Sequence, residues 1–198
     1  RIRVGEIDFI DQLSPSDVLQ VPQDAGIVTL KAPLVRWHAL QWQIDKAPFD
    51  GANLRLAVAH AIDRDRIMEV TIAGEGTIAN GLYPAEGTWW SSGVLKPPFE
   101  YSPEKAKQLL AESNWKPEDT LTINAPSDAI FTRIAQLVAE QLQAIGMKVQ
   151  LAPVPQSEYY PKVVQRSINF VPTTWVQRAD PDILANLLLN SKGGGNTT

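Results

Sequence analysis

The stretch that decides the fold is residues 120–151, which read TLTINAPSDAIFTRIAQLVAEQLQAIGMKVQL. A short strand is predicted over Thr120–Ala125 and another over Met147–Leu151. Between them, apolar residues recur at helical spacing over Ala129–Ile145, and Gly146 is a natural helix stop. The apolar positions are Ile130, Ile134, Leu137, Val138, Leu142 and Ile145. This stretch therefore predicts a strand, a helix and a strand in succession.

The same alternation continues downstream. A helix is predicted near Glu158–Gln165, a strand around Asn169–Trp175 and a helix over Ile183–Leu189. Strands that alternate with helices indicate βαβ units with mostly parallel strands. We therefore expect an α/β fold with a mixed, largely parallel sheet flanked by helices.

The region upstream of residue 120 divides into two parts. The first forty-odd residues are predicted to be rich in strands, over Ile2–Ile10, Ile27–Leu30 and Leu34–Ile44. Helix signals then take over, with N-caps predicted at Asn53, Asp63 and Ser102. The glycines of Gly74-Glu75-Gly76 are predicted to end the second of these helices rather than to bind a phosphate. Residues 76–101 read as a long irregular segment, which in a compact domain is usually functional.

Composition excludes several classes of protein. The chain has 198 residues, 44% of them hydrophobic, and a net charge of -4, so a nucleic-acid backbone binder is excluded. It has no cysteine, which rules out disulfides and cysteine-based zinc or nucleophile sites. No apolar run approaches the about 18 residues of a membrane span, and no signal peptide is recognised. The first residue is not Met and the last residues are glycine-rich, so we expect a piece of a longer protein.

Motifs for catalysis or metal binding are missing from the sequence. It contains no G-x-S-x-G, H-E-x-x-H or P-loop pattern. His60 and Asp63 have the spacing to share a helical face, but a packed histidine is the favoured interpretation because no further ligands are at hand. We therefore predict no catalytic residue, no metal and no cofactor. The alternative is a carbohydrate-active hydrolase that uses Asp180 and Asp182, although their spacing around Pro181 disfavours two converging carboxylates.

Aromatic and polar residues follow the predicted strand that ends at Trp175. Ligands of open α/β sheets bind outside the carboxyl ends of the strands. An indole, an amide and a guanidinium at that place make a recognition surface for a small molecule. Trp175, Gln177 and Arg178 are therefore predicted ligand-binding residues. Three more candidates lie in the long segment, namely Trp89, Trp90 and Tyr83.

Five segments of the chain, in order, resemble the family-5 extracellular solute-binding proteins, which include dipeptide, oligopeptide, glutathione and nickel-complex receptors. They are similar to the family's G-E-hydrophobic-D strand, its PPF-D and A-I-D-R signature, its Y-x-P-E-K-A-K helix, its Q-L-x-x-I-G-I-x-V step and its W-x-x-x-x-D-P-D turn. The segments are Gly5–Asp8, Ala47–Arg64, Tyr101–Leu110, Ile134–Val149 and Trp175–Asp182.

The resemblance implies a lobe of the type II periplasmic binding fold and not an enzyme. Residues 1–44 would form a hinge-side segment of the first lobe with the crossover strand, and residues 45–198 most of the second ligand-binding lobe. The implied function is the substrate-binding component of an ABC importer, which closes two lobes over a peptide-like or other small solute. The implied partner is a permease in the membrane, and the implied location is periplasmic or extracytoplasmic.

One departure from the family pattern concerns the ligand. Dipeptide and oligopeptide receptors of the family place an acid in the last of these turns, where it holds the ammonium group of the peptide. Here Gln177-Arg178-Ala179 precede Asp180, so that acid is missing. An arginine in its place favours a ligand carboxylate or another anion.

Overall fold

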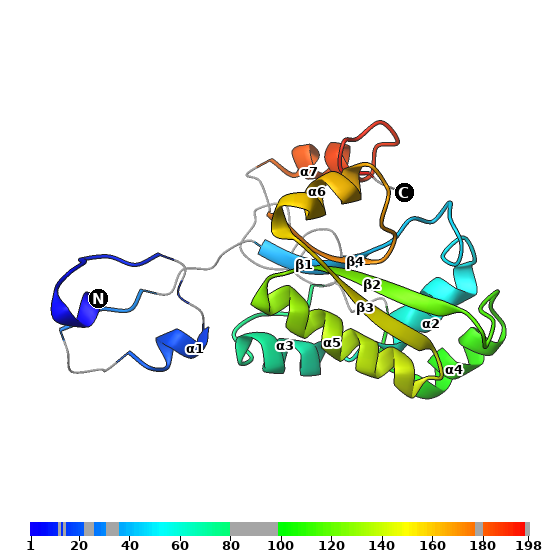
Figure 1. The fold of residues 1–198 in the computed structure, drawn as a ribbon, viewed down its shortest axis with the longest axis horizontal. Coiled ribbons are helices and arrows are strands. Elements are labelled where there is room, and N and C mark those ends of the chain that lie inside the picture. The colour runs from blue at the N-terminus through cyan, green and yellow to red at the C-terminus, as the bar shows by residue number, and fades with distance from the viewer. Residues whose placement is uncertain are drawn as a thin grey trace.

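The computed structural model describes residues 1–11, 13, 15–21, 26–30, 36–79, 99–176 and 180–196. Figure 1 shows the described residues of the segment 1–30 apart from an α/β body, which holds the four strands found in the described part of the chain. Within the described part of residues 1–30 there are only two short helical turns, at Ile2–Val4 and at Pro15–Val18 (α1). The strands predicted at Ile2–Ile10 and Ile27–Leu30 are therefore wrong. The first run instead closes a local turn, in which Gly5 N–H bonds to Ile2 O with a φ of 71°.

The sheet of the body is mixed, as predicted. Strand β1 (Arg36–Gln41) pairs antiparallel with β4 (Val171–Val176), and β2 (Thr120–Pro126) pairs parallel with β3 (Lys148–Val154). A parallel bridge between Ile123 and Phe170 joins the two ladders, with Asn124 N–H donating to Phe170 O at 2.9 Å. The resulting strand order is β1-β4-β2-β3, and β1 alone is antiparallel among them.

Helices cover both faces of this sheet. Helix α5 (Ala129–Ala144) lies against the face on which Leu121, Ile123 and Ala125 of β2 are buried. Figure 1 shows α3 (Arg64–Ile72) and α4 (Pro103–Ala111) on the side of α5, and α6 (Gln156–Val164) and α7 (Pro181–Leu188) on the opposite side. Helix α2 (Ala52–Ala61) packs against α4 and α5. None of the described helices is long and apolar enough to cross a membrane.

Two of the three predicted helix N-caps are present in the structure. The Asp63 carboxylate accepts from Arg66 N–H at 3.0 Å and the Ser102 hydroxyl from Lys105 N–H at 3.4 Å, so both predicted caps are confirmed. Gly74 follows α3 with a φ of 73°, as expected of a helix end. The Asn53 cap is wrong, because α2 already begins at Ala52 and the Asn53 amide donates to Glu112 O instead.

A stack of three aromatic rings joins β1 to the rest of the body. The Trp42 ring lies 5.3 Å from that of Phe49 and 5.8 Å from that of Phe170, and all three planes are nearly parallel. Phe49 and Phe170 are fully buried. Because Trp42 follows β1 directly, this stack fixes the carboxyl end of β1. The amino end of β1 lies beside the carboxyl end of β4.

Candidate functional site

The candidate site lies at the edge of the sheet where β2, β3 and β4 end. These three strands run in the same direction, so their carboxyl ends meet at one edge, on the left in Figure 1. Trp175 is the one predicted ligand residue within the described part of the chain. Gln177, Arg178, Trp89, Trp90 and Tyr83 lie outside the described residues, so their roles stay predictions.

Trp175 is half-buried on β4, directly across from Trp37 of β1. The two indoles help to line a hollow of about 250 Å³ between the sheet and α7. The other lining residues are Ala39, Leu40, Gln41, Leu188, Gly195 and Asn196. Trp175 thus has an apolar surface beside it at the edge of the sheet.

Residues 190–196, near the glycine-rich end of the chain, form part of this surface. Gly193 N–H donates to Asn190 O at 2.8 Å and Gly195 N–H to Leu187 O at 3.1 Å. A side chain on Gly195 would lie 3.1 Å from the Trp175 ring. The turn over residues 190–196 therefore folds back on α7 and packs against Trp175.

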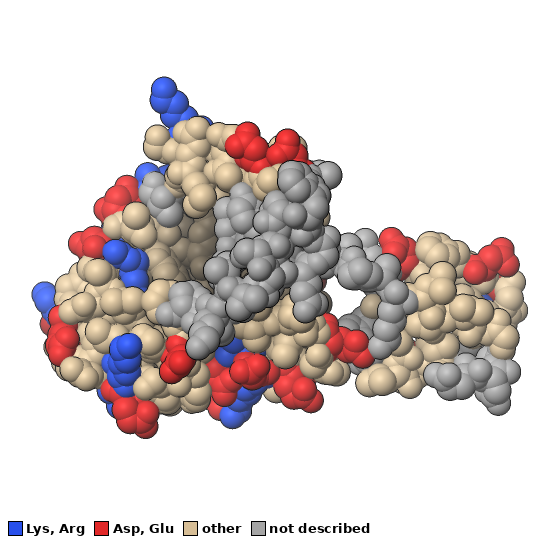
Figure 2. Space-filling view, turned by 180° about the vertical axis from the view of Figure 1, so that it is seen from behind, with Lys and Arg blue, Asp and Glu red and all other residues tan. Residues whose placement is uncertain are grey.

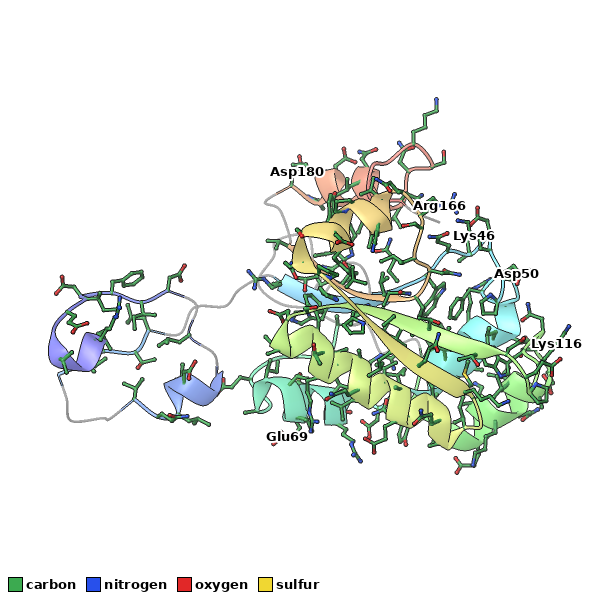
Figure 3. The ribbon with its side chains drawn as sticks, viewed as in Figure 1. Lys46, Asp50, Glu69, Lys116, Arg166 and Asp180 are labelled. Atoms are coloured by element: carbon green, nitrogen blue, oxygen red, sulfur yellow. The ribbon has the colours of Figure 1, made fainter. Side chains whose placement is uncertain are left out.

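The two acids of the hydrolase alternative cap a helix instead of facing each other. Asp180 is the N-cap of α7, and its carboxylate accepts from Asp182 N–H at 2.9 Å. The Asp182 carboxylate accepts from the Asn186 amide at 2.7 Å. Both acids are exposed, and Figure 3 shows Asp180 at the start of α7. Acid–base cleavage of a glycoside requires two carboxyl groups that flank the scissile bond, and these two acids instead bond within α7.

His38 is a residue of this edge that the sequence did not single out as functional. It lies opposite Thr174 in the β1–β4 ladder, and its Nδ1 is 2.7 Å from the Thr174 hydroxyl. The edge of the Phe131 ring from α5 packs on the imidazole, with ring centroids 5.6 Å apart. Partial burial and the nearby Arg36 lower the pKa of His38 below its ordinary value, against a smaller opposing effect of Asp128. Thr174 and Phe131 are far from His38 in sequence, so no local pattern could have revealed the group.

His60 is a packed histidine, as the favoured interpretation had it. It is 5% exposed, and its Nδ1 is 2.7 Å from Glu100 O, a contact in which the imidazole must donate. Arg64 donates to Phe99 O at 3.2 Å. Within the described part of the chain, no three potential metal ligands cluster. His60 and Arg64 thus hold the backbone that leads into α4.

A polar cluster closes the opposite end of the sheet. Asn169 accepts from Gln43 N–H at 2.7 Å, and Lys46 donates to Arg166 O at 2.9 Å. The Arg166 guanidinium binds the Asp45 carboxylate, and this hydrogen bond lowers the pKa of Asp45. Figure 3 shows Lys46 and Arg166 close together, on the side away from Asp180. The cluster therefore belongs to the scaffold that ties β1 to β4, at a distance from the candidate site.

The architecture is thus a mixed α/β body with aromatic side chains at the carboxyl edge of its sheet. The profile of the bacterial extracellular solute-binding proteins, family 5 (middle) matches residues 1–196, and the chain belongs to this family. The members of this family are receptors for solutes and not enzymes. The comparisons give the hydrolase alternative no support.

Curated relatives are about a quarter identical to this chain over the aligned residues. The dipeptide-binding protein of Escherichia coli K12 is 25% identical over 188 residues, which are 92% of this chain and 35% of that protein. Heme-binding protein A of Haemophilus influenzae is 27% identical over 204 residues, covering all of this chain and 37% of that protein. The glutathione-binding protein of Escherichia coli K12 is 24% identical over 76% of this chain and 29% of its own length. The chain thus spans about a third of the length of these relatives.

Solved structures agree on the fold. The substrate-binding protein CtaP of Listeria monocytogenes matches 99% of this chain and 41% of its own, with a TM-score of 0.87 and 21% identity. DppA of Helicobacter pylori, in complex with the peptide STSA, matches 93% of this chain and 36% of its own, with a TM-score of 0.81 and 26% identity. The predicted α/β lobe of the periplasmic-binding-protein type is therefore confirmed.

Proposed function

We propose that this chain is a lobe of the substrate-binding component of an ABC importer, which captures a peptide-like or other small solute and delivers it to a permease in the membrane. The observation that carries the proposal is the family match over residues 1–196, together with Trp175 at the carboxyl edge of the sheet. The mechanism is closure of two lobes over the solute, which shifts an open population to a closed one. Such a receptor works outside the cytoplasm, where it meets the permease at the membrane.

The proposed contacts with the solute come from two segments. Trp175 supplies an apolar wall, and Gln177 and Arg178 follow it in the chain. Arg178 lies in the turn in which the dipeptide and oligopeptide receptors of the family carry an acid. Its guanidinium therefore pairs with an anionic group of the solute. The remaining proposed walls are Trp89, Trp90 and Tyr83.

The test is calorimetry on the complete gene product with three probes, namely the dipeptide Met-Leu, glutathione and heme. At least one probe should bind the unmodified protein. Arg178→Ala should then weaken binding by roughly 1.5–3 kcal/mol, because a charge-assisted hydrogen bond is lost. Trp175→Ala should weaken it too, through lost apolar contact.

A matched control is Arg66→Ala, which removes an exposed arginine of α3 that pairs with Glu140 of α5. Its affinity should equal that of the unmodified protein. Unchanged affinity of Arg178→Ala would remove Arg178 from the site. Failure of all three probes to bind, or recovery of a chemically altered probe by mass spectrometry, would count against a receptor for solutes of this kind.

A further inference from the structure

Two polar side chains of β1, those of Arg36 and His38, lie at the edge of the sheet that carries the candidate site. The β1–β4 register places Arg36 opposite Val176, Trp37 opposite Trp175 and His38 opposite Thr174. The amino end of β1 therefore lies at the same edge as the carboxyl end of β4. Arg36 and His38 flank Trp37 in sequence, so their side chains point to the α5 face of the sheet, opposite Trp37 and Trp175. Both side chains are accessible to solvent, although the Phe131 ring covers part of His38.

The His38 ring has one nitrogen left for a further bond. Its Nδ1 is occupied by the Thr174 hydroxyl at 2.7 Å, and the Phe131 ring covers one side of the imidazole. Within the described part of the chain, Nε2 has no hydrogen-bond partner among the contacts of His38. The Thr174 and Phe131 contacts orient the ring, so Nε2 is the ring nitrogen through which a solute would bond.

The charges around His38 favour an anion. The charged groups that act on it are Arg36 from its own strand and Asp128 from the start of α5. Arg36 shifts the pKa of His38 more than Asp128 does. The Asp128 carboxylate is also engaged as the N-cap of α5, where it accepts from Ile130 and Phe131 N–H groups at 2.9 and 3.3 Å. Arg36 therefore places a positive charge next to His38 on the same face of the strand, where it can pair with an anion.

We propose that Arg36 and His38 form a carboxylate-binding subsite at the same edge of the sheet as Trp175 but on its α5 face, with an ion pair from Arg36 and a hydrogen bond from His38 Nε2. This inference rests on the proposed function and narrows the solute to one that carries a carboxylate. A bound carboxylate stabilises the imidazolium form, so binding is coupled to uptake of one proton by His38. Affinity for a carboxylate therefore rises as the pH falls through the titration of His38, by at most about tenfold per pH unit.

The experiment follows the histidine resonances of the complete gene product, labelled with ¹³C at histidine Cε1. The protein is titrated with pH in sodium acetate and, in parallel, in sodium chloride of the same ionic strength. The His38 resonance is the one missing from His38→Gln. We expect the pKa of His38 to be higher in acetate than in chloride, and the difference to disappear in Arg36→Gln.

Two controls stay within the same protein. The resonance of His60, which is buried, should not respond to acetate, and Arg66→Gln on α3 should behave as the unmodified protein. The same pKa of His38 in acetate and chloride, or a difference that persists in Arg36→Gln, would overturn the subsite. If a probe binds in calorimetry but acetate leaves the pKa of His38 unchanged, only this subsite is overturned. If acetate raises the pKa of His38 but none of the three probes binds, the result counts against the proposed receptor function instead.

Discussion

Tyr159 shows how one buried side chain fastens a helix to the sheet. Its ring is 8% exposed on α6, and its hydroxyl donates to Pro172 O on β4. Burial raises the pKa of Tyr159 far above its ordinary value, so the hydroxyl remains a donor at any physiological pH. The side chain thereby links the helix that follows β3 to the strand that carries Trp175.

Tyr159→Phe should lower the free energy of unfolding by about 1–2 kcal/mol, because a buried carbonyl loses its donor while the ring still packs. Urea unfolding followed by far-UV circular dichroism measures this change. Tyr160→Phe is the matched control, since the neighbouring ring is 64% exposed. Equal stability of the two variants would show that the Tyr159 hydroxyl bond contributes nothing.

At the scale of elements, the turn over residues 190–196 depends on one glycine more than on its neighbour. A Cβ on Gly193 would lie 2.3 Å from the backbone oxygens of Asn186 and Leu187, whereas a Cβ on Gly194 would meet nothing within 4 Å. These oxygens are backbone atoms at the end of α7, so they cannot move aside as the end of a flexible side chain could. The turn can therefore tolerate a side chain at Gly194 but not at Gly193.

Gly193→Ala should destabilise the protein by roughly 1–3 kcal/mol, the usual cost of forcing atoms into a closely packed site. Gly194→Ala should leave the stability unchanged. Because the turn packs on Trp175 through Gly195, the first variant should also change the tryptophan emission spectrum. Identical urea midpoints and spectra for the two variants would mean that the turn does not pack as the structure describes.

Local signals in the sequence predicted most elements of the body but not how distant ones meet. The spacing of apolar residues placed α5 to within one residue, and Asp63 and Ser102 cap the helices that their residue types suggest. Pairing of β1 with β4 joins residues more than 120 positions apart, and no periodicity encodes such a partner. The His38 group escaped prediction for the same reason, because the pairing itself creates it.

At the scale of the whole molecule, the predicted boundary between the two lobes after residue 44 can be tested, because β1 lies before it and pairs with β4 after it. A fragment of residues 36–198 keeps β1 and the Trp42 stack, whereas a fragment of residues 45–198 loses both and exposes one edge of β4. Trp42 is half-buried, so its removal should cost no more than the about 3–5 kcal/mol that is usual for a fully buried aromatic side chain. The shorter fragment loses Trp42 and the β1–β4 hydrogen bonds together, so it should be clearly less stable in urea. Equal stability of the two fragments would instead favour a second lobe that begins at residue 45 and that is stable without β1.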